Sequence, residues 1–331
     1  MAQTILVTGG AGYIGSHVVA LLLEQGKRVV VLDDLSRGRM DAVKRAEAVG
    51  GGFCEFEFGD LGDRAFTQSV FHRWRIDAVV HLAAFKSVED SVGDPESYQR
   101  NNVQATEVLI GAMVDSGVRR VVFSSTATVY GESEGALAED AGLNPLSPYA
   151  QTKLDAEQLL ASQAASHGWG VVNLRFFNVA GAHPSGQLGE YVDRPQNLMP
   201  VLLAAARLGQ PMPIFGTDWA TTDGTCVRDY VHVMDISYGV VDALEAAYRV
   251  GTVFTWNLGT GRGSTVLEVV EAVRKASGVD VQTEDAARRP GDTGRLVADA
   301  TLIGTEMGWV PRFDLDAMAG HAWAWMQVSL G

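Results

Sequence analysis

TILVTGGAGYIGSHVVALLLEQGKRVVVLD, residues 4–33, decides the fold of this chain. A β-branched run is followed by the glycine cluster GGAGYIG at 9–15, a helical stretch and a second β-branched run that ends in Asp33. Glycines permit a tight turn and close backbone approach, and the N-terminus of the following helix offers N–H groups to a pyrophosphate. The glycines alone would also suit a purely structural turn. Between a strand and a helix, they predict a dinucleotide site.

Asp33 indicates which dinucleotide. A carboxylate at the end of the second strand can bind the hydroxyls of the adenosine ribose, and it would repel a 2′-phosphate. The sequence therefore favours NAD over NADP, although Arg37 close by would suit NADP.

The same alternation of short apolar runs and helical stretches continues along the first half of the chain. Further buried strands are predicted at FCEFEFGD (53–60), DAVVHLAA (77–84), RRVVFSS (119–125) and GVVNLRFFN (170–178). Such a pattern predicts an α/β fold with a Rossmann-type doubly wound parallel sheet. After residue 180 this alternation of apolar runs and helical stretches becomes less regular. We expect an NAD-binding domain over 1–180 and a smaller mixed α/β substrate domain over 181–331, with some elements of the latter returning to the first sheet.

Bulk properties exclude several classes of protein. The 331 residues are 47% hydrophobic and carry a formal net charge of −14, which argues against nucleic acid or an anionic membrane as partner. Two cysteines, Cys54 and Cys226, lack CxxC spacing, and the histidines form no metal-binding pattern, so we expect neither a disulfide framework nor a metal. With neither an export signal nor an apolar run long enough to span a bilayer, we expect a cytoplasmic protein.

NPLSPYAQTK at 144–153 holds a candidate acid/base pair. Ser147 and Pro148 suit the N-cap and first position of a helix, which places Tyr149 and Lys153 on one face. A half-buried aromatic beside a solvated amine is the plain alternative for this spacing. The functional interpretation is a phenol that exchanges protons, with the ammonium lowering its pKa.

Other motifs follow the predicted strands. GDL at 59–61, HLAAFK at 81–86 and SSTATVYG at 124–131 stand at carboxyl ends of strands, where such folds bind ligands. With Tyr149 and Lys153, this arrangement resembles the extended short-chain dehydrogenase/reductase family, in which a hydroxyl residue after the fifth strand joins the Tyr-x-x-x-Lys pair. Here that residue is Thr126, which alone could be an ordinary strand-end residue.

The second half resembles the UDP-glucose 4-epimerases within that family. The motifs are FKSVEDS (85–91), NNV (101–103), RFFNVAGAHPSG (175–186), QNLMP (196–200), PIFG (213–216), DGTCVRDYVHV (223–233) and RRPGD (288–292). The resemblance implies reversible interconversion of UDP-glucose and UDP-galactose through a transient 4-keto sugar, with the hydride held on tightly bound NAD. It also implies a homodimer built by helices near 95–117 and 150–167.

The resemblance also assigns roles to residues. Tyr149, Lys153 and Thr126 would be catalytic. NAD would be bound by Gly9, Gly12, Tyr13, Ile14, Gly15, Asp33, Asp60, Leu61, Lys86, Asn101, Tyr149 and Lys153. The UDP-sugar would be bound by Thr126, Tyr149, Asn178, Asn197, Leu198, Arg228, Arg289, Asp292 and Leu296. Taken singly, Asn178 could cap a turn, Arg228 could pair with Asp229, and Asp292 could belong to a Gly-Asp turn.

Two other functions share parts of this pattern. A nucleotide-sugar 4,6-dehydratase would need an Asp-Glu pair after the hydroxyl residue, where this chain has Ala127 and Thr128. A non-catalytic NAD-sensing or scaffold protein would not need all of Thr126, Tyr149 and Lys153. In the epimerases that this chain resembles, the position of Leu296 lies beside the C2 substituent of the sugar, and the size of leucine there predicts weaker activity on UDP-N-acetylglucosamine and UDP-N-acetylgalactosamine. The plain alternative is a core leucine.

Overall fold

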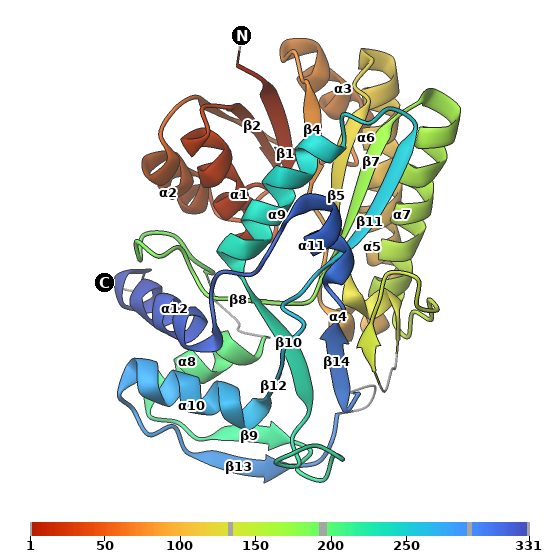
Figure 1. Ribbon diagram of the computed structural model, residues 1–331. Coiled ribbons are helices and arrows are strands. Elements are labelled where there is room, and N and C mark those ends of the chain that lie inside the picture. Colours follow the sequence, from red (N-terminus) through yellow and green to blue (C-terminus); the bar gives the residue numbers. More distant parts are fainter. Residues whose placement is uncertain (1, 132–134, 192–196, 290–292, 330–331) are drawn as a thin grey trace. The chain divides into compact units, whose positions relative to one another are not determined.

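The computed structural model describes residues 2–131, 135–191, 197–289 and 293–329 (Figure 1). The chain forms two compact units and passes between them several times. The first unit comprises residues 1–129, 145–175 and 237–256, and the second comprises 130–144, 176–236 and 257–331.

A seven-stranded sheet forms the centre of the first unit. Its order is β11-β7-β5-β4-β1-β2-β3. The strands are β1 (Thr4–Thr8), β2 (Arg28–Asp33), β3 (Cys54–Phe58), β4 (Ala78–His81), β5 (Arg120–Thr126), β7 (Gly170–Phe176) and β11 (Thr252–Leu258). Pairings from β3 through β2, β1 and β4 to β5 are parallel. The reversal of order at β1 and β4 is that of the doubly wound fold, so the predicted fold class is confirmed.

Helices cover both faces of this sheet. They are α1 (Tyr13–Glu24), α2 (Met40–Gly50), α3 (Arg64–Arg73), α4 (Val88–Gly93), α5 (Pro95–Tyr98), the π-helical turn η1 (Gln99–Gln104), α6 (Ala105–Ser116), the 3-10 turn η2 (Ala127–Val129), α7 (Pro148–His167) and α9 (Val233–Ala246). Figure 1 shows α1, α2 and α9 on one face and α3, α6 and α7 on the other.

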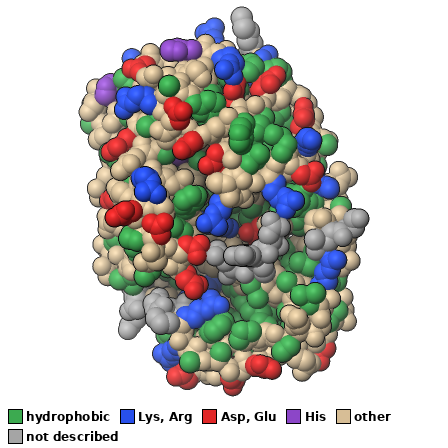
Figure 2. Space-filling model, turned by 180° about the vertical axis from the view of Figure 1, so that it is seen from behind, with side chains coloured by type: hydrophobic (Ala, Val, Ile, Leu, Met, Phe, Trp, Pro, Cys, Tyr) green, Lys and Arg blue, Asp and Glu red, His purple; other side chains and the backbone are tan. Residues whose placement is uncertain are grey.

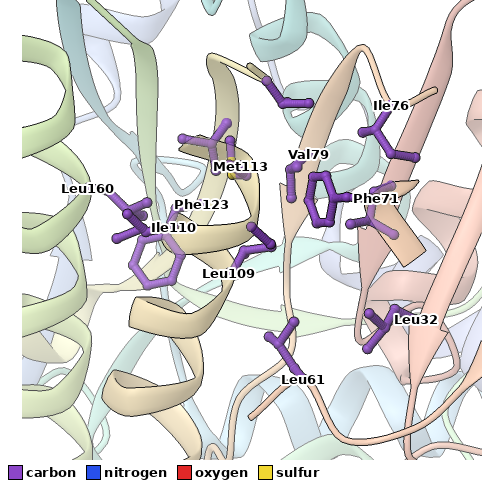
Figure 3. Packing of buried hydrophobic residues seen from close by; sticks show 14 of the residues in the cluster. Leu32, Leu61, Phe71, Ile76, Val79, Leu109, Ile110, Met113, Phe123 and Leu160 are labelled. Atoms are coloured by element: carbon purple, nitrogen blue, oxygen red, sulfur yellow. The ribbon is translucent and has the colours of Figure 1, made fainter. Parts of the chain in front are cut away.

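The core of the first unit lies between the sheet and α3, α6 and α7. Figure 3 shows Phe123 of β5 beside Ile110 of α6 and Leu160 of α7, and these side chains are nearly or wholly inaccessible to water. Burying side chains of this size stabilises the folded state by about 1.5 to 3 kcal/mol each. The same contacts fix α7 over β5, and α7 carries Tyr149 and Lys153.

The second unit combines a small sheet with a helical layer. A five-stranded sheet has β8 (Asn178–Ala180) beside β10 (Val227–His232), which is followed by β14 (Arg295–Ala298) and β6 (Ala136–Leu137), with β12 (Gly263–Thr265) antiparallel to β10. β9 (Met212–Phe215) and β13 (Thr283–Ala286) form a parallel pair. The helices are α8 (Leu198–Leu208), α10 (Val266–Ser277), α11 (Thr301–Met307) and α12 (Leu315–Ser329), of which α8, α10 and α12 share one buried apolar cluster.

The face of the molecule drawn in Figure 2 carries charged side chains of both signs. On this face, Lys and Arg side chains lie among Asp and Glu side chains. Of the helices that the structure describes, none has the length and apolarity that crossing a bilayer requires.

A buried hydrogen-bond chain surrounds His81 at the end of β4. The Thr106 hydroxyl donates to the carbonyl oxygen of Asn102 at 2.6 Å, so it accepts from Nε2–H of His81 at 2.9 Å. The Thr8 hydroxyl accepts from the backbone N–H of Ala83 at 3.3 Å and donates to Nδ1 of His81 at 2.7 Å. Both imidazole nitrogens are therefore satisfied only in the neutral ring, and burial lowers the pKa of His81 to about 3.

This histidine should make the protein sensitive to acid. Because its folded-state pKa lies below the ordinary value of 6.5, its contribution is complete above that pH and declines as the pH falls toward 3. We expect His81→Gln to flatten the dependence of unfolding free energy on pH by up to about 1.4 kcal/mol per pH unit in this range. Denaturant unfolding at a series of pH values between about 8 and 4.5 measures this dependence. A slope in His81→Gln equal to that of the parent protein would contradict the assignment.

Candidate active site

The glycine loop between β1 and α1 has no room for side chains at two positions. A Cβ at Gly15 would lie 2.1 Å from the carbonyl oxygen of Gly9, and one at Gly9 would lie 2.7 Å from the backbone nitrogen of Ala83. Gly9 also has a φ of 72°, which glycine adopts without strain. α1 begins at Tyr13 with no side-chain cap on Gly12 and no acidic residue in its first turn, so its N-terminal dipole suits an anion.

Asp33 ties this loop to the end of β2. Its Oδ2 accepts from the backbone N–H of Ala11 at 3.0 Å, and its Oδ1 accepts from that of Leu35 at 2.8 Å. Burial raises the pKa of Asp33, and these two hydrogen bonds oppose the rise. The carboxylate is thus fixed beside the glycine loop, the geometry that a ribose-binding acid requires.

The other predicted cofactor residues lie in the same unit, at or near the carboxyl ends of its strands. Asp60 and Leu61 follow β3, Lys86 follows β4, and Asn101 lies in η1. Ile14 is in the first turn of α1. The Asp60 carboxylate accepts from the backbone N–H of Gly62 at 2.7 Å. Leu61 belongs to the buried core.

Asn102 was not among the predicted site residues, yet its side chain joins three segments around the predicted site. Its Oδ1 accepts from the backbone N–H of Phe85 at 2.8 Å and from Nδ2 of Asn101 at 3.0 Å. Its Nδ2 donates to the carbonyl of Phe85 and to the hydroxyl of Thr152, both at 3.0 Å. Thr152 in turn donates to the backbone carbonyl of Tyr149 at 2.8 Å. Its place within the NNV motif was the only sequence signal.

Tyr149 lies in the first turn of α7, as the sequence predicts. Ser147 caps this helix by accepting from the backbone N–H of Ala150 at 3.2 Å, and Pro148 occupies its first position. Burial raises the pKa of the Tyr149 phenol to about 12, and the nearby Thr126 hydroxyl opposes that rise. The Thr126 Oγ1 lies 3.1 Å from the Thr128 hydroxyl. A phenol and two threonine hydroxyls are therefore close together at the end of β5.

Lys153 is buried one turn further along α7. Its Nζ donates to the carbonyl oxygen of Ser124 at 2.7 Å and lies 4.7 Å from the ring centroid of Phe123. Burial lowers the pKa of Lys153 to about 7, and the nearby Glu157 carboxylate opposes the fall. The structure thus groups Thr126, Tyr149 and Lys153 as predicted. The sequence did not predict that burial and the Glu157 carboxylate would shift the pKa of Lys153.

Three predicted sugar-nucleotide residues lie on neighbouring strands of the second unit. Through parallel strand pairings, Arg228 of β10 is aligned with Leu296 of β14, and Asn178 of β8 is aligned with Tyr230 of β10. The Arg228 guanidinium donates to the carbonyl oxygens of Val227 and Thr293 at 3.0 and 2.9 Å. Those bonds fix its position beside Leu296.

The remaining predicted residues occupy other parts of the second unit. Asn197 precedes α8 as its N-cap residue, with no side-chain cap bond, and Leu198 is the first helical residue. The Arg289 guanidinium lies over the Phe215 ring, 3.9 Å from its centroid. Asp292 lies outside the described residues.

The acidic neighbour of Arg228 has a structural role. Asp229 is fully buried and accepts from the backbone N–H groups of Thr260, Gly261 and Ala298 at 2.8 to 3.2 Å. It therefore anchors the end of β14 and the segment after β11. Among the described residues, no cluster of three His, Cys, Asp or Glu side chains could hold a metal ion.

Comparison with known proteins identifies relatives over nearly the whole chain. A UDP-glucose 4-epimerase of Bacillus subtilis is 45% identical over 333 residues, covering 99% of this chain and 98% of its own. The solved UDP-glucose-4-epimerase of Stenotrophomonas maltophila, with bound NAD and formylated UDP-arabinopyranose, is 41% identical, with a TM-score of 0.96 over 99% of both chains.

A relative with a broader name is also similar. The solved UDP-Glc/GlcNAc 4-epimerase of Campylobacter jejuni is 36% identical, with a TM-score of 0.86 over 99% of this chain and 100% of its own. Residues 5–259 match the model of one protein family. The chain therefore belongs to the NAD dependent epimerase/dehydratase family.

Proposed function

We propose that the protein catalyses reversible 4-epimerisation of UDP-glucose and UDP-galactose through a transient 4-keto sugar, with NAD as a bound, recycled cofactor. The observation that carries this proposal is the grouping of the Tyr149 phenol, the Thr126 hydroxyl and the buried Lys153 ammonium at the end of β5. It occurs in a chain that is 45% identical to a UDP-glucose 4-epimerase over almost its full length. A dehydratase is not favoured, since Ala127 is a buried apolar residue and Thr128 has no carboxyl group.

NAD fits the residues of the first unit. The tight turn from Gly9 to Gly15 depends on backbone packing that a Cβ at Gly9 or Gly15 would disrupt, and the uncapped N-terminus of α1 suits a pyrophosphate. Asp33 would hold the adenosine ribose, and Asp60, Lys86 and Asn101 would complete the site. When bound, NAD would take up a hydride from C4 of the sugar and return it to the opposite face.

The chain's own groups manage the proton. Tyr149 would accept the proton of the sugar 4-hydroxyl and later return it, while the Thr126 hydroxyl orients the phenol or relays the proton. Because burial raises the pKa of Tyr149, the phenolate needs positive charge nearby, and the Lys153 ammonium is held on the same helix face. Without Tyr149 to accept it, loss of the 4-hydroxyl proton would produce an alkoxide in water.

The second unit would hold the UDP-sugar. Arg228 and Arg289 would pair with the pyrophosphate, which an acidic protein must neutralise locally. Asn178, Asn197, Leu198 and Asp292 would contact the remainder of the nucleotide sugar. We accordingly assign NAD binding to a domain over 1–180 and UDP-sugar binding to one over 181–331, with α9 and β11 returning to the first sheet.

The assembly and compartment follow from the same proposal. A homodimer would form through helices near 95–117 and 150–167, where Val114 is an exposed apolar side chain. Cytoplasmic location is supported by two half-buried cysteines without disulfide spacing.

Removing one phenolic oxygen tests the acid/base assignment. We expect Tyr149→Phe to retain fold and NAD but to convert UDP-galactose about 10² to 10⁴ times more slowly, since positioned proton transfer contributes on that scale. Tyr248→Phe, whose ring lies under the Arg120 guanidinium, is the matched control and should keep full activity. Turnover of Tyr149→Phe within a few-fold of the parent would reject the role.

The cofactor assignment has a test that does not depend on activity. Asp33→Asn should lower the NAD content of the purified protein. It should also reduce the preference of the protein for NAD over NADP, because the charge that repels a 2′-phosphate is gone. Asp34→Asn, at the adjacent exposed carboxylate, should change neither property. Nucleotide released on denaturation can be identified by chromatography, and equal NAD and NADP in the parent protein would overturn the assignment.

Leu296 should set the range of sugars. A leucine is smaller than tyrosine and larger than serine, so an acetamido group at C2 should be accepted with crowding. Pocket sterics of about 1 to 3 kcal/mol predict turnover of UDP-N-acetylglucosamine roughly ten to a few hundred times less efficient than that of UDP-glucose. Leu296→Ser should narrow this gap, and Leu296→Tyr should abolish only the acetylated activity. Unchanged ratios of kcat/KM in both variants would refute the assignment.

A further inference from the structure

Glu157 and Arg175 form an ion pair inside the first unit. Nε and Nη2 of Arg175, on β7, donate to the two carboxylate oxygens of Glu157, on α7, at 3.0 and 2.8 Å. The two residues are only 5% and 4% exposed. Removing two charges from water is costly, so a buried ion pair is often no more stabilising than apolar residues of similar volume. Stability alone gives no reason for this pair.

Its position on α7 suggests a different role. Tyr149, Lys153 and Glu157 follow one another at intervals of four residues, so they lie along one face of the helix. The carboxylate is held in a two-bond fork by Arg175, a planar group that matches it geometrically. Fixed in this way, Glu157 cannot swing toward Lys153 and draw the ammonium away from Tyr149.

Burial disfavours a positive charge on Lys153, and the groups that face it from β4 and β5 are uncharged. From β5, it meets the carbonyl and, at 3.5 Å, the hydroxyl of Ser124. From β4, it faces His81, whose pKa is lowered by burial and by this ammonium. On α7 its titratable neighbours are Tyr149 and Glu157, and Glu157 is the charge that raises the pKa of Lys153.

We propose that Glu157, fixed by Arg175, is a positioning residue that keeps Lys153 in its ammonium form. The inference deepens the proposed function, because the ammonium is what favours the Tyr149 phenolate there. Arg175 contributes by aligning the carboxylate, which lies on α7 one turn beyond Lys153. Two unit charges roughly 6 to 10 Å apart, at an effective dielectric constant near 20, shift a pKa by about 1 to 2 pH units.

A direct titration of Lys153 tests this. The purified protein would be labelled with ¹³Cε-lysine, and the Lys153 resonance would be assigned by its loss in Lys153→Met. We expect Glu157→Gln to lower the Lys153 midpoint by about 1 to 2 pH units, because the nearby anion is removed and the Arg175 cation remains. Asp155→Asn, at a carboxylate on the same helix that accepts from Gln151, should leave it unchanged.

A second variant keeps the test valid if Glu157→Gln fails to fold. Glu157→Leu combined with Arg175→Met replaces the pair by apolar groups of similar volume, which proteins commonly tolerate. It should lower the Lys153 midpoint by less than the single variant, since no unpaired cation is left behind. An unchanged midpoint in the folded variants would overturn the proposal and leave the pair a purely structural one.

The pH profile of activity connects the pair to catalysis. In Glu157→Gln, we expect the alkaline limb of the kcat profile to move to lower pH by the same amount as the Lys153 midpoint, with activity recovering below the shifted limb. A uniform loss of kcat at all pH values would contradict a role in protonation. Absence of epimerase activity in the parent protein would refute the proposed function instead, and the titration of Lys153 would still decide the electrostatic inference.

Discussion

The hydrogen bond from the Lys153 ammonium to the Ser124 carbonyl is the constraint on which the first unit depends. It joins α7 to β5 inside a water-excluded layer, where a lysine must be satisfied by protein groups or lose its charge. The apolar contacts of Phe123 and Leu160 hold the helix in place, and this bond joins it directly to the strand. Tyr149 and Thr126 meet because the strand and the helix are aligned there.

Burial makes this arrangement both ordered and electrostatically demanding. Low dielectric surroundings strengthen each charge, so Lys153 responds to the Glu157 carboxylate and acts on His81 in turn. A net charge of −14 over the whole chain says little about such a site, because distant surface charges are screened by solvent and salt. What matters is the order of a few buried groups along α7 and the strands beneath it.

Local patterns predicted the fold class, and they fail where contacts join distant segments. The strand, glycine loop and helix at 4–24 are specified by adjacent residues, as is the cap of α7 by Ser147 and Pro148. Asn102, by contrast, lies in a π-helical turn and bonds to Phe85 and Thr152, which no periodicity connects to it. β6 is two residues long, too short for a pattern, yet it joins the second unit's sheet.

Contacts between distant segments also limit what the sequence could predict about the proposed UDP-sugar residues. Arg228 and Leu296 were named from motifs, but their alignment on β10 and β14 is a matter of strand register. Asp229, adjacent to Arg228, is buried and held by backbone N–H groups. One face of β10 is therefore anchored, while the Arg228 side chain on the other face stays partly accessible. Such alternation lets the accessible residue change without disturbing the anchor. The face of α7 that carries Tyr149 and the buried Lys153 and Glu157 has no comparable freedom, because a change in any of its charges alters the others. Substrate range should therefore vary among related chains more readily than proton chemistry.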